Sequence, residues 1–366
     1  MKKIALILLS LILFNCNNNN KINSFNSYLE EIEQEFAPDK SIAVFDIELD
    51  KERSRWILRG ETTSLESKNA VLSSTKSILE NTDFQDSIIV LPHPALGADT
   101  LAVVNVSVAN LRRNPSVAAE LIDQVIMGDR LRVLKKERSF YLVQTDYGYL
   151  GWITGYSIEQ KLADSEWFTN SMGKIMALNS IIYSEPDTES DLISDVVINS
   201  KIHVINNSRK WTNVRLPDGR KGYIPNKDIE LITNKFKEIS IDELLNTAKN
   251  MLGIPYLWGG NSSKMNDCSG FTQIVFLAND IALPRDARQQ ALIGTTVNYD
   301  STFQDVMPGD LLFFGSDKRI THVGISLGDY EFIHQDGFVM INSFNKNDEN
   351  FSEHRKNVLQ IIKRII

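Results

Sequence analysis

The sequence predicts an α+β protein built from several small domains. Its 366 residues are more than one hydrophobic core usually organises. Strand-like alternation of apolar and polar residues recurs along the chain, shorter stretches carry the helical spacing, and one segment is repeated at a shift of 71 residues. These observations predict a small N-terminal α+β domain, two small antiparallel β-barrels and a C-terminal α+β domain.

Residues 1–20 are typical of an export signal. Two lysines precede an apolar run from Ile4 to Phe14 that is too short to span a bilayer comfortably. Cys16 and a polar asparagine stretch follow, as in bacterial lipoprotein signals, although Asn15 stands where Gly, Ala or Ser is usual. We expect lipid on Cys16, which predicts an exported lipoprotein anchored to a membrane in the cell envelope, on the periplasmic side of the outer membrane.

Charge and cysteine content disfavour some functions and exclude some structural features. The formal net charge is -8, from 39 basic and 47 acidic residues, and no basic cluster is present, so a nucleic-acid binder is disfavoured. Acylation of Cys16 would leave Cys268 as the only thiol, which excludes an internal disulfide and a cysteine-based metal site. A lone thiol is either buried and inert or reactive.

Residues 24–98 predict the small N-terminal α+β domain. Two alternating segments, SIAVFDIEL and RWILRGET, predict a hairpin from Ser41 onward. Residues Ser67 to Glu80 carry helical spacing, and Ser87 to Leu91 return to a strand pattern. The sequence assigns no chemistry to this domain.

An internal repeat predicts two copies of one antiparallel barrel, over residues 99–162 and 170–233. At the shift of 71, the segment from Leu131 to Ile153 falls on the segment from Ile202 to Ile224. Matching positions include Val133 with Val204, Phe140 with Trp211, Val143 with Val214, Gly148 with Gly219, and Trp152 with Tyr223. Both units resemble bacterial SH3-type domains, and we expect their aromatic residues to be mostly barrel core.

The C-terminal domain, residues 239–366, holds the candidate nucleophile. It opens with an amphipathic helix over Ile239 to Leu252. After Asp267, apolar residues at helical spacing place Cys268 at the start of a second helix. A helix N-terminus favours a thiolate, which is the nucleophilic form of cysteine.

Two histidines could serve that thiol. His322 opens the strand segment HVGISLG and His334 ends EFIH, so neighbouring antiparallel strands could bring both rings together. A metal site from these two and Asp336 is the alternative, but its spacing matches no compact zinc pattern, and we expect neither metal nor cofactor. The other histidines, His93, His203 and His354, have no such context.

Six sequence blocks then carry a family resemblance. GIPYLWGG, DCSGFTQIVFL, LPRDARQQ, PGDLLFF, THVGISLG and EFIHQDG, in this order, resemble the NlpC-type family of cell-wall cysteine peptidases, which are papain-like in fold. The SH3-type units in front resemble the layout of gamma-D-glutamyl-L-diamino acid endopeptidases. The resemblance implies Cys268 as nucleophile, His322 as base and His334 as the residue that orients the base.

The resemblance also implies substrate-contacting residues. Tyr256 would help bind the substrate carbonyl or the developing oxyanion. In the same way Asp267, Ser269 and Asp286 would contact the peptide, and Glu120 and Tyr156 of the first SH3-type unit would close its amine end. Close relatives often carry Ser where this chain has Ala287, so one hydrogen bond is expected to be missing.

The implied reaction is hydrolysis of the γ-D-glutamyl bond to the following diamino acid in peptidoglycan stem peptides. Peptides with a free N-terminal L-Ala are the expected substrates. The residues by themselves argue for acyl transfer by a thiol. A non-catalytic peptidoglycan-binding lipoprotein and a related thiol amidase or acyltransferase are the alternatives.

Overall fold

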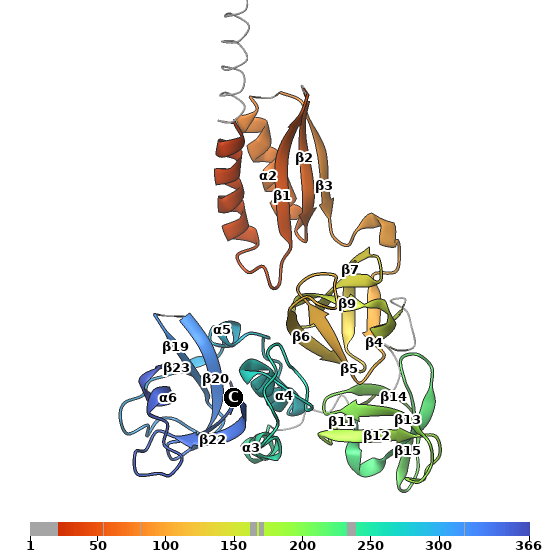
Figure 1. Ribbon diagram of the computed structural model, residues 1–366, viewed down its shortest axis with the longest axis vertical. Coiled ribbons are helices and arrows are strands. Elements are labelled where there is room, and N and C mark those ends of the chain that lie inside the picture. Colours follow the sequence, from red (N-terminus) through yellow and green to blue (C-terminus); the bar gives the residue numbers. More distant parts are fainter. Residues whose placement is uncertain are drawn as a thin grey trace, which may run out of the picture. The chain divides into compact units, whose positions relative to one another are not determined.

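The computed structural model describes residues 21–53, 55–80, 82–161, 167, 172–232, 239–317 and 319–366. The expected signal over residues 1–20, with Cys16, lies outside these residues. So do residues 162, 170–171 and 233 at the ends of the two expected SH3-type ranges. The chain divides after Gly97 into two compact units, and helices and strands occur in both, which confirms the α+β class (Figure 1).

The first unit is a three-stranded sheet with two helices on one face. A helix over residues 21–36 precedes β1 (Phe45–Glu52), β2 (Arg55–Thr62), α2 (Leu65–Ile78) and β3 (Phe84–Val90). The hairpin β1–β2 is antiparallel, and α2 crosses over so that β3 pairs parallel to β2. The expected hairpin, helix and strand are confirmed, with β3 beginning three residues before the predicted Ser87.

The first SH3-type unit is one antiparallel sheet of seven strands. The strands are β4 (Leu101–Val104), β5 (Val108–Arg112), β6 (Leu121–Ile126), β7 (Arg130–Glu137), β8 (Phe140–Thr145), β9 (Leu150–Thr154) and β10 (Ile158–Gln160). Their spatial order is β10-β4-β7-β8-β9-β5-β6. Within the described residues β10 and β6 end the sheet and do not pair with each other, so the expected barrel is not closed.

The second SH3-type unit repeats that order strand for strand. It contains β11 (Met172–Ile175), β12 (Asn179–Tyr183), β13 (Leu192–Val197), β14 (Lys201–Asn207), β15 (Trp211–Arg215), β16 (Lys221–Pro225) and β17 (Ile229–Leu231). Its order is β17-β11-β14-β15-β16-β12-β13, equivalent to the first unit at the shift of 71. At one equivalent turn Gly128 has φ 88° and Asn199 has φ 70°, because both turns need the left-handed region.

The C-terminal domain packs helices against a six-stranded antiparallel sheet. Its helices are α3 (Ile241–Asn250), α4 (Cys268–Ala278), α5 (Ala287–Gln290) and α6 (Glu353–Asn357). Its strands are β18 (Thr295–Val297), β19 (Leu311–Ser316), β20 (Arg319–Gly328), β21 (Glu331–Asp336), β22 (Phe338–Ser343) and β23 (Leu359–Arg364), in the order β18-β23-β19-β20-β21-β22.

Side chains alternate between the two faces of this sheet, and a separate hydrophobic cluster lies on each face. Phe313, Val323 and Ile333 join the side chains of α3 and α4 on one face. Phe314 and Phe332 lie in an aromatic cluster on the other. Helix α4 is buried along almost its whole length, so its start has a fixed position relative to β20.

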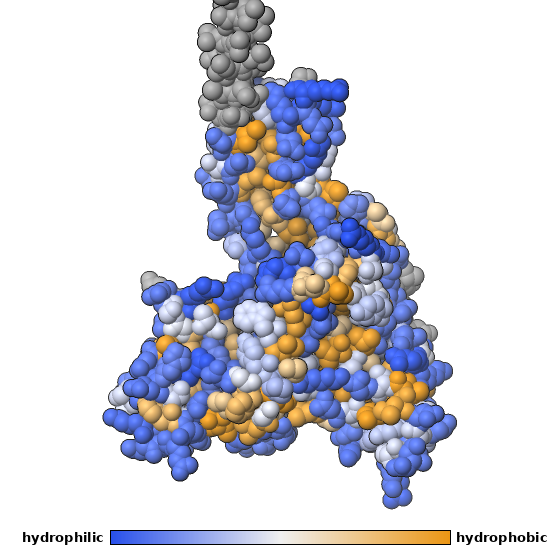
Figure 2. All heavy atoms as spheres, in the orientation of Figure 1, coloured by the Kyte–Doolittle hydropathy of each residue, from blue (hydrophilic) through white to orange (hydrophobic). Residues whose placement is uncertain are grey.

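Figure 2 shows a mainly hydrophilic face with smaller apolar areas. Among the described residues, none of the helices combines the length and apolar character that crossing a bilayer requires.

Candidate active site

Cys268 is the first residue of α4. Asp267 caps this helix, because its Oδ1 accepts the backbone N–H of Gly270 at 2.7 Å. The backbone N–H of Val323 on β20 also hydrogen-bonds the sulfur. Since Val323 directly follows His322, the helix start and the histidine strand meet at the thiol.

Burial of Cys268 opposes the thiolate that the helix start is expected to favour. Burial raises the pKa of Cys268 to about 12, and the Asp267 carboxylate adds to the rise. Hydrogen bonds from the backbone of Val323 and Ser269 act in the opposite direction but are outweighed. With its pKa raised in this way, the thiol needs a base to ionise near neutral pH.

The two predicted histidines form a hydrogen-bonded pair. His322 Nε2 and His334 Nδ1 are 2.8 Å apart, and the two rings are perpendicular. The second ring nitrogen of His334, Nε2, lies 2.8 Å from Asn342 Oδ1. No sequence pattern indicated Asn342, because this residue reaches His334 only when β22 pairs with β21.

Both imidazoles are neutral near pH 7. Burial lowers the pKa of His334 to about 4, with Arg355 contributing, although the hydrogen bond to Asn342 opposes the change. Burial also lowers the pKa of His322 far below 6.5, again with Arg355 contributing. A neutral imidazole can act as general base toward a neutral thiol, and His322 is the residue next to Val323, whose backbone N–H bonds the sulfur.

Tyr256 lies near the sulfur and keeps its hydroxyl proton. Its pKa is raised above 10 by burial and next by the electrostatic influence of Cys268 and Asp267. Its backbone N–H donates to the carbonyl of Gly337 at 2.8 Å, which fixes this segment to the turn after β21. A protonated phenol in this position can donate a hydrogen bond to a substrate oxygen.

Asp267 and Ser269 are engaged by protein groups. Arg285 Nη2 donates to Asp267 Oδ2 at 2.7 Å, and Arg285 Nη1 donates to Ser269 Oγ at 3.0 Å. The backbone N–H of Gly259 also donates to Asp267 Oδ2. The structure thus assigns both residues a role in holding the start of α4. Sequence reasoning missed Arg285, although it lies inside the quoted block LPRDARQQ.

Arg285 also ties the C-terminal domain to the first SH3-type unit. Its Nε donates to Asp123 Oδ1, and both side chains are almost fully buried. Asp123 Oδ2 accepts the hydroxyl of Tyr147, and Asn261 Nδ2 donates to Asp123 Oδ1 at 3.2 Å. This buried network connects the nucleophile helix to the neighbouring unit.

Acidic residues from the C-terminal domain and from the first SH3-type unit lie where the amine end of the peptide substrate is expected. Asp286 Oδ1 accepts the hydroxyl of Tyr149 at 3.1 Å. Glu120 Oε1 accepts the indole N–H of Trp258 at 3.0 Å, and its Oε2 accepts Arg113 Nε at 2.6 Å. Arg113 is electrostatically coupled to Asp286 and Tyr149 as well, so these groups form one cluster.

Tyr156 is not brought to this cluster. Its side chain is 76% exposed, and none of the described contacts joins it to the C-terminal domain. Tyr149, seven residues earlier on the turn before β9, is the buried aromatic that reaches Asp286. Tyr149 and not Tyr156 is therefore the tyrosine that contacts Asp286, and the expected contact of Tyr156 with the substrate stays a prediction. Ala287 is buried at the start of α5.

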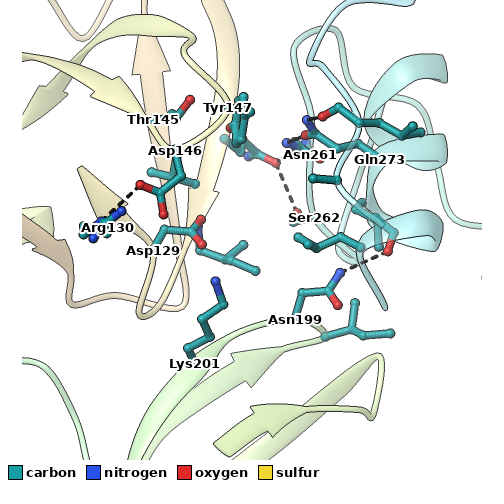
Figure 3. A pocket seen from close by; sticks show the side chains of 18 residues that line it. Asp129, Arg130, Thr145, Asp146, Tyr147, Asn199, Lys201, Asn261, Ser262 and Gln273 are labelled. Carbon is teal, nitrogen blue, oxygen red and sulfur yellow. Dashed lines mark hydrogen bonds and ion pairs between the residues drawn. The ribbon is translucent and has the colours of Figure 1, made fainter. Parts of the chain in front are cut away.

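A separate cavity of about 230 Å³ lies where both SH3-type units meet α4, and neither Cys268 nor the two histidines line it (Figure 3). On its wall Asn199 Nδ2 donates to the carbonyl of Ile274 at 3.0 Å. From the same SH3-type unit, Lys174 Nζ donates to the carbonyl of Leu277 at 2.7 Å. The second SH3-type unit thus holds the C-terminal half of the nucleophile helix.

Two family models match the chain. Residues 253–357 match the NlpC/P60 family, and residues 107–159 match the bacterial SH3 domain. The gamma-D-glutamyl-L-lysine dipeptidyl-peptidase of Bacillus cereus is 28% identical over 234 residues, covering 59% of this chain and 68% of that protein. Dipeptidyl-peptidase 6 of Lysinibacillus sphaericus is 27% identical over 242 residues, covering 64% of this chain and 86% of that protein.

A solved structure shares the fold. The crystal structure of an NlpC/P60 family protein from Bacillus cereus superposes with a TM-score of 0.65 at 22% identity, covering 72% of this chain and 99% of that one. A helix that begins with cysteine and packs on an antiparallel sheet carrying a histidine pair is the arrangement expected of a papain-like thiol hydrolase. This chain is a cysteine peptidase with an NlpC/P60 domain and a bacterial SH3 domain, as the resemblance implied.

Proposed function

We propose that the protein hydrolyses the γ-D-glutamyl bond to the following diamino acid in peptidoglycan stem peptides that have a free N-terminal L-Ala. The observation that carries the proposal is the hydrogen bond between the Cys268 sulfur and the backbone of Val323, the residue that follows His322 of the His322–His334 pair. The similarity to the gamma-D-glutamyl-L-lysine dipeptidyl-peptidase of Bacillus cereus supports the γ-D-glutamyl bond as the target.

Cys268 is the proposed nucleophile and His322 its base. Because His334 engages Nε2 of His322, Nδ1 is the nitrogen that takes the thiol proton as sulfur attacks the γ-carbonyl carbon. Collapse of the tetrahedral intermediate breaks the C–N bond, and His322 returns that proton to the leaving amine. Water then attacks the thioester with His322 again as base, which releases the peptide acid and restores the thiol.

The proposed role of Tyr256 is to stabilise the oxyanion. Its phenol stays protonated because its pKa is raised, and it is electrostatically coupled to Cys268. A hydroxyl donor beside the attacking sulfur gains strength as charge develops on the carbonyl oxygen.

The cluster of Glu120 and Asp286 supports recognition of a free α-ammonium group. Both acids are near Arg113 and at least partly exposed, so a substrate cation could pair with them at the outer end of the site. Asp267 and Ser269, which both accept hydrogen bonds from Arg285, would act by holding the helix start rather than by binding peptide.

The proposed location is the cell envelope. Lipid on Cys16 would anchor the protein on the periplasmic side of the outer membrane, where stem peptides are available. The basis is the signal-like sequence of residues 1–20.

A substrate panel tests this function. Purified protein and Cys268→Ala are incubated with L-Ala-γ-D-Glu-diamino acid peptide, its N-acetylated form and intact sacculi, and products are identified by mass spectrometry. The expected result is rapid release of L-Ala-D-Glu from the free-amine peptide by the wild-type protein alone. Faster digestion of sacculi, or equal rates on the acetylated peptide, would contradict the proposed preference. Binding of peptide without cleavage would favour a non-catalytic wall-binding protein.

A further inference from the structure

His322, His334 and Asn342 lie on three neighbouring strands and form one hydrogen-bonded row. In the sheet register His334 pairs with Gly324, two residues after His322, and with Met340, two residues before Asn342. Residues two apart on a strand share a face, so the three polar side chains line one diagonal. The two steps of the row are each 2.8 Å long.

The orientation of the Asn342 amide is set from its other end. Its Nδ2 donates to the backbone carbonyl of Asn350 at 3.0 Å. The carbonyl oxygen Oδ1 therefore faces His334 Nε2. Because an amide oxygen only accepts hydrogen bonds, His334 Nε2 must carry the proton.

The proton on His334 Nε2 in turn determines the tautomer of His322. A neutral imidazole has one N–H, so a proton on Nε2 of His334 leaves its Nδ1 as an acceptor. His334 Nδ1 can accept only from a protonated His322 Nε2. This leaves His322 Nδ1 without a proton, which is the state required of the base for Cys268.

We propose that Asn342 is a positioning residue that fixes the tautomers of both imidazoles and so keeps His322 Nδ1 ready to take the thiol proton. The inference rests on the proposed function of Cys268 and His322. It extends the catalytic row by one residue beyond His334, to a side chain that does not touch the substrate.

Three variants separate this role from a structural one. Asn342→Leu removes both the acceptor for His334 and the donor to Asn350. Asn342→Asp keeps an acceptor oxygen for His334 while losing the donor to Asn350, so it restores only the contact that the proposal requires. Asn347→Leu, at an exposed asparagine of the neighbouring loop, is the matched control.

Steady-state kinetics and imidazole ¹⁵N NMR are the readouts. We expect Asn342→Leu to lower kcat about 10- to 100-fold with KM changed less than about threefold. Asn342→Asp should stay within about threefold of wild-type kcat at pH 8. The NMR spectra should show Nε2–H on both rings in the wild-type protein and loss of that single pattern in Asn342→Leu.

The pH profile of Asn342→Asp provides a further readout. A carboxylate beside His334 favours the imidazolium, so the acidic limb of kcat should move to higher pH than in the wild type. The surrounding charged or titratable groups are Arg355, His354 and Asp336, and they are the same in both proteins.

The possible outcomes are distinguishable. If wild-type kcat is measurable and Asn342→Leu matches Asn347→Leu, the inference is wrong although the proposed function stands. Equal losses in Asn342→Leu and Asn342→Asp would assign Asn342 to loop anchoring instead. If the wild-type protein cleaves nothing, the proposed function fails, and the NMR tautomer pattern still tests Asn342.

Discussion

Arg285 Nε donates to Asp123 in an ion pair that joins the C-terminal domain to the first SH3-type unit, with side chains 1% and 0% exposed. The same guanidinium holds Asp267, the cap of the nucleophile helix. One buried cation thus serves two buried carboxylates from different parts of the chain. Loss of that cation would leave both acids without their main partner.

We predict that Arg285→Met destabilises the protein strongly. Removing one partner of a buried ion pair typically costs about 3–5 kcal/mol, because the remaining charge stays desolvated. Chemical denaturation measures this change. Arg220→Met is the control, since Arg220 pairs with Asp218 at the surface and such pairs contribute about 1 kcal/mol or less. Equal shifts in the two variants would refute the importance of the buried network.

Alkylation of Cys268 should be slow near neutral pH in the absence of substrate. Its pKa is raised to about 12, so the thiolate fraction is small at pH 7 and rises about tenfold with each pH unit below that value. Iodoacetamide labelling across pH 6–10, followed by mass spectrometry, checks the slope, with Cys268→Ser as the unlabelled control. A rate that levels off below pH 8 would show a preformed thiolate instead.

The free energy of unfolding should fall as the pH is lowered through the range between the unfolded-state and folded-state pKa values of His334. His334 has a folded-state pKa of about 4, whereas an exposed histidine titrates near 6.5. Between these values the unfolded state binds more protons, so unfolding becomes more favourable as pH falls. We expect His334→Gln to lose part of that dependence, on the order of 2 kcal/mol between pH 7 and 4.5. Denaturation midpoints at both pH values test it, and an unchanged pH dependence would argue against a buried neutral imidazole.

Tyr149 and Tyr156 should differ in their effect on the proposed substrate. Tyr149→Phe removes the hydroxyl that orients Asp286, so we expect KM for the free-amine peptide to rise about 5- to 10-fold. Tyr156→Phe alters an exposed side chain of the same unit and should leave KM unchanged. Kinetics on both variants decide between the two tyrosines. A larger effect from Tyr156→Phe would support the substrate contact that the sequence predicts for Tyr156.

Local patterns were sufficient for much of the fold. The repeat at 71 residues anticipated two sheets with the same strand order, and apolar spacing after Asp267 anticipated a helix that begins at Cys268. Both features depend on residues near one another in sequence. The sheet remains open between β10 and β6 because closure depends on contacts that alternation does not encode.

Site properties that arise from long-range packing were not predictable. Arg285 meets Asp123 across 162 positions and Tyr149 meets Asp286 across 137, so no local pattern links them. The pKa of Cys268 is raised chiefly by burial, which depends on packing between distant segments. Asn342 joins the histidines only through strand pairing.

Trapping of the acyl-enzyme tests the central claim most directly. The protein is mixed with L-Ala-γ-D-Glu-diamino acid peptide, quenched in acid within the first turnover and digested for mass spectrometry. We predict an L-Ala-γ-D-glutamyl adduct on the peptide that contains Cys268, and no turnover by Cys268→Ala. Cleavage by Cys268→Ala at the wild-type rate would show that this thiol is not the nucleophile.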